Sequence, residues 1–150
     1  MSSRRRAREY ALQALFQCDL ADVAISEGVR RFWSAQIEDD GTLVDRPVDT
    51  EEREFTERLL SGVGEYHLAI EERIEAVSTN WRVARMPGVD RNILRIAAYE
   101  LLYCPDIPAN VTINEAIELA KRFGGAESSG FVNGILDRIA HEAGRGGRNG

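Results

Sequence analysis

The chain has 150 residues, of which 43% are hydrophobic and 29% charged, and this composition fits one compact domain or two very small subdomains rather than a multidomain enzyme. The 25 acidic and 19 basic side chains give a formal net charge of −6, so the molecule as a whole does not attract nucleic acid or an anionic membrane. No apolar run approaches the roughly 20 residues of a membrane span, and the two cysteines form neither a disulfide framework nor a CxxC motif. We therefore expect a cytoplasmic protein that does not enter a membrane.

Charge is unevenly distributed along the chain. Residues 1–10 carry four arginines against one glutamate, a local net charge of +3, whereas residues 38–75 carry thirteen acids against four arginines, a local net charge of −9. A basic end on an otherwise acidic or neutral chain is typical of a short arm that binds a polyanion. The alternative is a solvated tail without a ligand.

Helical periodicity predicts the elements of the first half. Apolar residues recur at helical spacing over residues 7–18, so the arginines lie at the start of an amphipathic helix. A second helix is expected over residues 26–37, followed by a loop. Asp49 and Glu52 form a D-x-x-E capping box that opens a third helix, and the periodicity resumes over residues 66–77.

The second half contains a helix that is apolar on nearly all sides. It is expected over residues 91–104, with Asp90 as its N-cap and Pro105 as its end. Such a helix should be central and buried. Trp81 and Tyr99 are expected to fill the core, although both could line a partner interface.

Two further helices follow the central one. Thr112 and Glu115 form a capping box for a helix whose inward stripe ends at Phe123, before two glycines. Ser128 or Ser129 then caps the last helix.

The sequence shows no alternating strand pattern at any position. We therefore predict an all-α fold of six or seven helices in two small packed bundles that share the central buried helix. The helical domain is expected over residues 1–143, followed by a flexible Gly/Arg-rich tail over residues 144–150.

Motifs that carry catalytic chemistry are few. His67 and His141 are the two histidines, and neither lies in an HExxH motif or at metal-ligand spacing. The phosphate-loop, dinucleotide-binding and nucleophile-elbow motifs do not occur in the sequence. We therefore expect a binding protein rather than an enzyme, with no cofactor and no metal.

Three segments of the sequence stand out together. They are the Arg-rich start at residues 4–16, the segment 89–102, and the segment 113–124 followed by the Phe-Val-Asn-Gly run at 131–134. In their residues, order and spacing they resemble the NusB family of bacterial transcription antitermination factors. The resemblance covers nearly the whole chain except the 38–50 loop and the tail.

The resemblance implies an all-α, non-enzymatic RNA-binding protein. Members of the family pair with NusE, which is also a small-subunit ribosomal protein, and the pair binds the boxA element of nascent, single-stranded RNA. That complex helps RNA polymerase to read through terminators, notably in ribosomal RNA operons. Some members form homodimers that mask the RNA and partner surfaces, so the oligomeric state stays open.

The resemblance assigns phosphate contacts to basic residues. The family's Arg-rich motif falls on the four arginines near the N-terminus, namely Arg4, Arg5, Arg6 and Arg8. Guanidinium groups bind phosphate oxygens bidentately, and a helix N-terminus adds backbone donors. Lys121 and Arg122 could extend this basic track, or could instead pair with Glu118.

A second RNA-facing region implied by the resemblance is the loop and helix start at Glu127, Ser128, Ser129 and Phe131. An exposed Phe131 would stack on an unpaired base, whereas a buried one would be a core residue of the first turn. Phe16 carries the same two alternatives. A Glu127 carboxylate next to RNA repels phosphate unless it accepts a hydrogen bond from a base amine.

For NusE the resemblance points to the start of the central helix, near Asp90 and Arg91. A different class of function stays open, namely a helical protein-interaction adaptor whose N-terminal arginines bind an acidic protein surface. Replacing the arginines and titrating RNA and protein partners separately distinguishes the two functions.

Overall fold

A computed structural model describes residues 3–36, 48–79 and 81–145 of the chain. Within these ranges there are seven α-helices and one short 3-10 helix, and no strand. The all-α class predicted from periodicity is confirmed. The chain divides into two compact units, Met1–Gly64 and Glu65–Gly150. None of the described helices has both the length and the apolar character needed to cross a bilayer.

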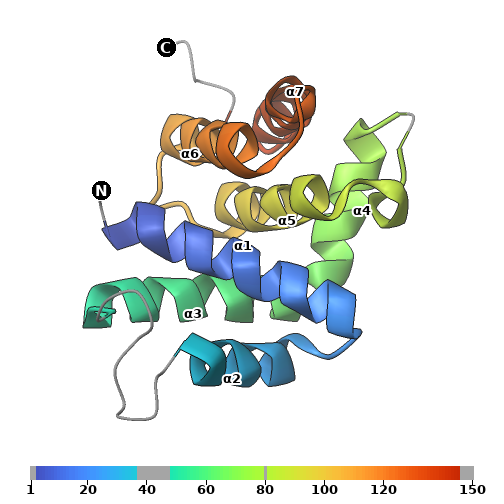
Figure 1. Cartoon of the computed structure of the whole chain (residues 1–150). Helices are drawn as coiled ribbons and strands as arrows, with labels where there is room; N and C mark the ends of the chain where they lie inside the picture. The colour runs from blue at the N-terminus through green and yellow to red at the C-terminus, as the bar shows by residue number, and fades with distance from the viewer. Residues whose placement is uncertain (1–2, 37–47, 80, 146–150) are drawn as a thin grey trace. The chain divides into compact units, whose positions relative to one another are not determined.

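The first unit is built from three helices, which are α1 (Ser3–Ala21), α2 (Ile25–Gln36) and α3 (Thr50–Glu65) (Figure 1). Tyr10 of α1 packs against Phe32 and Trp33 of α2, with ring centroids 6.0 Å from Tyr10 in both cases. The Thr56 hydroxyl donates to the carbonyl oxygen of Ala7 over 3.3 Å, which ties α3 to α1. The three helices therefore share one small aromatic and aliphatic core.

The close approach of α1 and α2 depends on Gly28. A Cβ atom at this position would lie 1.9 Å from Sγ of Cys18, a separation that no side chain tolerates without a shift of the neighbouring atoms. Burial raises the pKa of the Cys18 thiol, and the Asp19 carboxylate raises it further. Cys18 is therefore a protonated core residue rather than a reactive thiolate.

The start of α3 confirms the predicted cap at Asp49. Its Oδ1 accepts a hydrogen bond from the backbone N–H of Glu52 over 2.7 Å, and the helix begins at Thr50. The loop expected before it, from Glu38 through Pro47, lies outside the described ranges, as does residue 37, the predicted end of the second helix.

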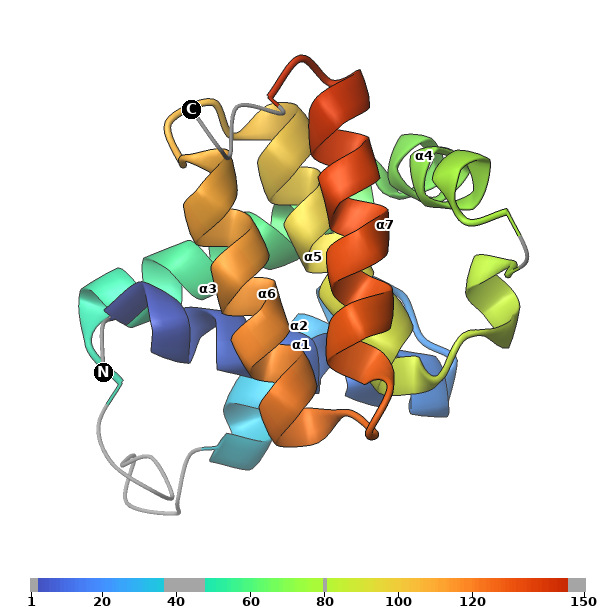
Figure 2. The same cartoon turned by 90° about the horizontal axis from the view of Figure 1, so that it is seen from above.

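The second unit contains the remaining elements, which are α4 (His67–Val77), the 3-10 helix η1 (Val83–Arg85), α5 (Gly88–Tyr103), α6 (Ala109–Phe123) and α7 (Ser128–Glu142). Figure 2 shows α5, α6 and α7 side by side, and each of the three contacts the other two. Helix α5 also contacts α4. Ile93, Leu94 and Tyr99 of α5 are buried, so the predicted burial of this helix is confirmed.

The predicted N-caps of α5 and α6 are wrong. Helix α5 begins at Gly88 and α6 at Ala109, so Asp90 and Thr112 lie inside the first turn and a proline precedes each helix instead. The physical reason is that both side chains form buried tertiary hydrogen bonds. The Thr112 hydroxyl donates to Oε1 of Glu100 over 2.7 Å, and the partner of Asp90 is described below.

Two aromatic residues predicted to be buried are exposed. Trp81, between α4 and η1, is 49% exposed, and Phe123, the last residue of α6, is 39% exposed. The guanidinium of Arg122 lies 4.9 Å from the centroid of the Phe123 ring. Helical spacing indicates which positions share a face, but it does not reveal whether another element covers that face.

Arg145 anchors the end of the described chain. Its guanidinium donates to four carbonyl oxygens at the end of α5 and in the turn that follows, those of Glu100, Leu101, Cys104 and Ile107. A cation at this position compensates the negative end of the helix dipole. Arg145 was expected in the flexible tail and is instead fixed to α5. Residues 146–150 lie outside the described ranges, so the domain boundary at residue 143 stays a prediction.

Candidate nucleic-acid interface

The first turn of α1 presents three of the predicted arginines. Arg4 and Arg5 are exposed and Arg6 is half-buried. The Arg4 guanidinium lies 4.5 Å from the centroid of the Phe55 ring, a cation–π contact that links the first turn of α1 to α3. The first turn contains no acidic residue, and the free N–H groups of a helix start favour an anion. This end of α1 is therefore suited to phosphate.

Arg8 differs from the prediction because it is buried, with 4% of its surface exposed. It lies one helical turn after Arg4 and therefore on the same face, and its guanidinium is 5.2 Å from the centroid of the Phe55 ring. A buried guanidinium does not reach a phosphate in solution. The candidate RNA surface of α1, which we call the arginine arm, thus consists of Arg4, Arg5 and Arg6.

The start of α7 is held by a buried hydrogen bond between Ser128 and Asp90. The Ser128 hydroxyl donates to Oδ1 of Asp90 over 2.7 Å and accepts from the backbone N–H of Gly125 over 2.9 Å. Both side chains are 5% exposed. A Cβ atom at position 124 would lie 2.5 Å from the Ser128 oxygen, so this turn requires Gly124.

This pair corrects two predictions. Ser128 was expected to cap α7 and to contact RNA, but it is the first residue of the helix and its hydroxyl is committed to the contact with Asp90. Asp90 was expected to cap α5 and to face NusE, and its buried carboxylate instead joins α5 to α7. The N-cap residue of α7 is Glu127, whose side chain makes no cap hydrogen bond.

The accessible part of this region consists of Glu127, which is exposed, and of Ser129 and Phe131, which are half-buried. The Phe131 ring meets the Trp81 ring edge to face, with centroids 6.2 Å apart and ring planes at 72°. A pocket of about 550 Å³ opens here, and it is lined by Trp81, Pro87, Asp90, Glu127, Gly130 and Phe131. The Phe131 ring therefore packs against the Trp81 ring and also lines this pocket.

Three other predicted RNA contacts lie on helix surfaces. Lys121 is exposed with its Nζ 3.9 Å from Oε1 of Glu118, which confirms the expected pair, an interaction of little energetic weight at a surface. Arg122 is exposed as well, and Phe16 of α1 is half-buried. The exposed charges of Lys121 and Arg122 remain accessible to a polyanion.

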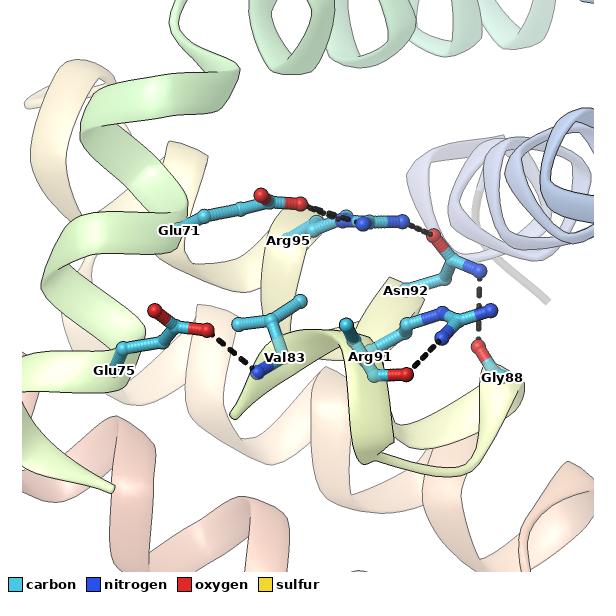
Figure 3. Close-up of polar contacts among 8 residues, drawn as sticks. Glu71, Glu75, Val83, Gly88, Arg91, Asn92 and Arg95 are labelled. Atoms are coloured by element: carbon cyan, nitrogen blue, oxygen red, sulfur yellow. Dashed lines mark hydrogen bonds and ion pairs between the residues drawn. The ribbon is translucent and has the colours of Figure 1, made fainter. Parts of the chain in front are cut away.

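A hydrogen-bond network fixes the beginning of α5 (Figure 3). Arg95 donates to Glu71 of α4 over 2.9 Å and to the side-chain oxygen of Asn92 over 2.8 Å. Arg91, predicted to contact NusE, is half-buried and donates to the carbonyl oxygen of Ala84 in η1 over 3.2 Å. The spacing of Asn92 and Arg95 is a local signal, whereas no sequence pattern indicated Glu71 as the partner.

The described residues contain no group of three or more His, Cys, Asp or Glu side chains that could hold a metal ion. His67 and His141 are both exposed, and they lie on different helices, α4 and α7. What these surfaces offer chemically is positive charge for phosphate and aromatic rings for stacking.

The sequence was compared with known families and proteins. Residues 5–141 match the NusB family. The chain is 50% identical over 141 residues to the transcription antitermination protein NusB of Anaeromyxobacter dehalogenans, an alignment that covers 93% of this chain and 92% of that protein. It is 45% identical over 137 residues to the protein of the same name from Bacillus subtilis, which covers 91% of this chain and 93% of that protein.

Solved structures show the same fold. The chain superposes on T. maritima NusB with a TM-score of 0.79 and 38% identity, over 95% of this chain and 93% of that one. A chain from the crystal structure of antitermination factors NusB and NusE in complex with dsRNA has the same fold, with a TM-score of 0.79 and 22% identity over 95% and 98% of the two chains. With the family match spanning nearly its full length and close relatives at half identity, the chain belongs to the NusB family.

Proposed function

We propose that the chain is a transcription antitermination factor that binds boxA RNA together with NusE and supports read-through by RNA polymerase, notably in ribosomal RNA operons. Its relatives from Anaeromyxobacter dehalogenans and Bacillus subtilis are named transcription antitermination proteins, and one protein of the same fold is seen with NusE and RNA. We further propose that it acts in the cytoplasm and has no enzymatic activity of its own.

The observation that carries the proposal is the arginine arm at the start of α1. The chain has a net charge of −6, so its attraction for RNA must come from a local group of cations. Arg4, Arg5 and Arg6 supply that group in the first turn of α1. Guanidinium groups bind phosphate oxygens in a bidentate manner, so the arm positions the RNA backbone without reading its sequence.

Base recognition requires a second kind of contact, which the start of α7 supports. Phe131 forms part of an open pocket wall, and an unpaired base can stack on such a ring. The exposed Glu127 carboxylate lies on the same pocket and can accept from the amino group of a base. Its charge repels phosphate, so we propose that it faces bases and not the backbone.

The small size of the basic surface indicates that tight RNA binding requires a partner protein. Three arginines neutralise few phosphates, and binding to RNA by this chain alone should be weak. A NusE subunit would add its own contacts beside the first set and thereby raise the affinity of the pair. Whether the chain also forms a homodimer stays a prediction.

The test is a titration of a boxA RNA oligonucleotide with the chain alone, with NusE alone and with both. We expect tight binding only for the two proteins together, and weaker binding of an oligonucleotide with the same bases in scrambled order. Equal affinity with and without NusE would contradict the proposal. If changing the arginine arm abolishes NusE binding in the absence of RNA, the chain is a protein-interaction adaptor instead.

A further inference from the structure

The segment between α4 and α5 exposes a large aromatic side chain. Of the two tryptophans, Trp33 is 5% exposed and belongs to the core of the first unit, whereas Trp81 is 49% exposed. The edge-to-face contact with Phe131 fixes the Trp81 ring while half of the side chain stays open to solvent. An exposed tryptophan held in one orientation is a feature of recognition surfaces.

Two arginines that follow Trp81 flank the short helix η1. Arg82 is its N-cap residue, with extended backbone, Arg85 is its last residue, and both are exposed. Val83 and Met86 are buried, so they anchor the turn between α4 and α5. Arg82 and Arg85 also border the same pocket.

Hydrogen bonds hold this turn in place. The backbone N–H of Val83 donates to Oε2 of Glu75 in α4 over 2.8 Å, as Figure 3 shows. On its other side, the Ala84 carbonyl accepts from Arg91 of α5. Both neighbouring helices thus fix the backbone between the two exposed arginines, and the Glu75 carboxylate is engaged in this contact.

The local charge is positive on an acidic chain. Residues 81–91 carry three arginines and one acid, a local net charge of +2, which leaves −8 on the rest of the chain. The single acid is Asp90, and its carboxylate accepts from the buried Ser128 hydroxyl. This is a second concentration of arginine, separate in sequence from the arginine arm.

Trp81 lines two pockets of different character. One is the pocket of about 550 Å³ that it shares with Phe131 and Glu127. The other, of about 800 Å³, is bordered by Arg82, Arg85 and the Glu75 carboxylate, which accepts from the backbone N–H of Val83. Two aromatic walls with a carboxylate acceptor suit a base, and a neighbouring hollow with two arginines suits the phosphate beside it.

We propose that Trp81, Arg82 and Arg85, which we call the tryptophan loop, form a second contact site for single-stranded RNA, with Trp81 stacking on a base next to the one at Phe131. The inference rests on the proposed RNA-binding function and extends that surface beyond Phe131. RNA fits better than an acidic protein surface because the arginines adjoin paired aromatic walls, the combination that binds single strands.

Stacking and phosphate contact are tested separately by titrating a boxA RNA oligonucleotide with the full chain and NusE. Trp81→Leu keeps an apolar side chain but removes the ring, and it should weaken binding by about 5-fold to about 150-fold, while Trp81→Phe should retain most of the affinity. Arg82→Ala and Arg85→Ala should each make the slope of log affinity against log salt shallower by about 0.7.

Matched controls come from the same unit. Leu68 is an exposed apolar residue of α4, and Arg73 is an exposed arginine of α4 that pairs with Glu142. Leu68→Ala and Arg73→Ala should leave RNA affinity and the salt slope unchanged. Thermal unfolding of every variant verifies that each is folded at the temperature of the titration.

Tryptophan fluorescence provides a direct readout of stacking. A base stacked on Trp81 should quench its emission, and RNA should therefore quench the wild-type protein. In Trp81→Phe the remaining emission comes from the buried Trp33, and the quenching should disappear. Persistence of the full quenching in this variant would overturn the stacking role.

The outcomes separate this inference from the proposed function. If the wild-type pair binds RNA and the arginine-arm variant weakens it, but every tryptophan-loop variant binds like the wild type, this inference alone is wrong. If the tryptophan-loop variants lose NusE while RNA affinity is intact, the loop is a protein contact and the inference is also wrong. If the wild-type chain together with NusE does not bind RNA, the proposed function is wrong, and the inference that rests on it is wrong with it.

Discussion

Changing Arg4, Arg5 and Arg6 together to alanine should flatten the salt dependence of RNA binding. Each phosphate of a single strand that a cation neutralises contributes about −0.7 to the slope of log affinity against log salt. Four arginines would contribute about −2.8, but Arg8 is buried against Phe55, and three arginines contribute about −2.1. The triple variant should lose that contribution, which corresponds to about a 100-fold smaller change in affinity per tenfold change in salt.

Arg8→Ala is the internal control. Its guanidinium is stacked on the Phe55 ring in the core of the first unit, so the substitution should leave the salt slope unchanged. It should instead lower the free energy of unfolding by about 2 kcal/mol, through loss of a desolvated cation–π contact and of the buried side-chain stem. Substitutions in the arginine arm should therefore change the salt dependence of RNA binding, whereas the substitution of Arg8 should change the free energy of unfolding.

Both quantities can be measured on the same preparations. Fluorescence anisotropy of a labelled boxA RNA with NusE present, at several KCl concentrations, gives the slope, and urea unfolding gives the stability. A triple variant with the wild-type slope would refute the role of the arginine arm. An Arg8→Ala slope as flat as that of the triple variant would show that Arg8 reaches phosphate, and the reasoning from burial would be wrong.

Three further predictions concern single positions. Phe131→Ala should weaken RNA binding by about 1–3 kcal/mol without changing the salt slope, and because Phe131 is only half-buried its effect in urea unfolding should stay below the roughly 3–5 kcal/mol of a core phenylalanine. Gly28→Ala should destabilise the protein by about 1–3 kcal/mol because its Cβ would meet the Cys18 sulfur, and calorimetry should show partial rescue in the Gly28→Ala, Cys18→Ala double variant. Arg145→Ala should cost about 1–2 kcal/mol of unfolding free energy through the lost carbonyl contacts, and an unchanged urea midpoint would show that those contacts contribute nothing.

The local signals in the sequence were sufficient for the class of fold and for several helix ends. Asp49 caps α3 as predicted, because a cap hydrogen bond reaches only three residues along the chain. Helix α5 ends at Tyr103, shortly before Pro105, and α6 ends at Phe123, directly before Gly124, since proline and glycine act on their own backbone. The placement of the arginines at the start of α1 was also predictable from the sequence, because their positions on the helix follow from its period.

Tertiary structure decided which of these side chains are accessible and which polar groups meet. Asp90 and Ser128 each have the sequence context of a helix cap, yet they bond to each other across 38 positions. Arg8 belongs to the same basic motif as Arg4 but is buried, whereas Trp81, an expected core residue, is half exposed. Periodicity gives the face on which a residue lies, but burial depends on which distant element packs against that face, and that contact is made only when the helices assemble.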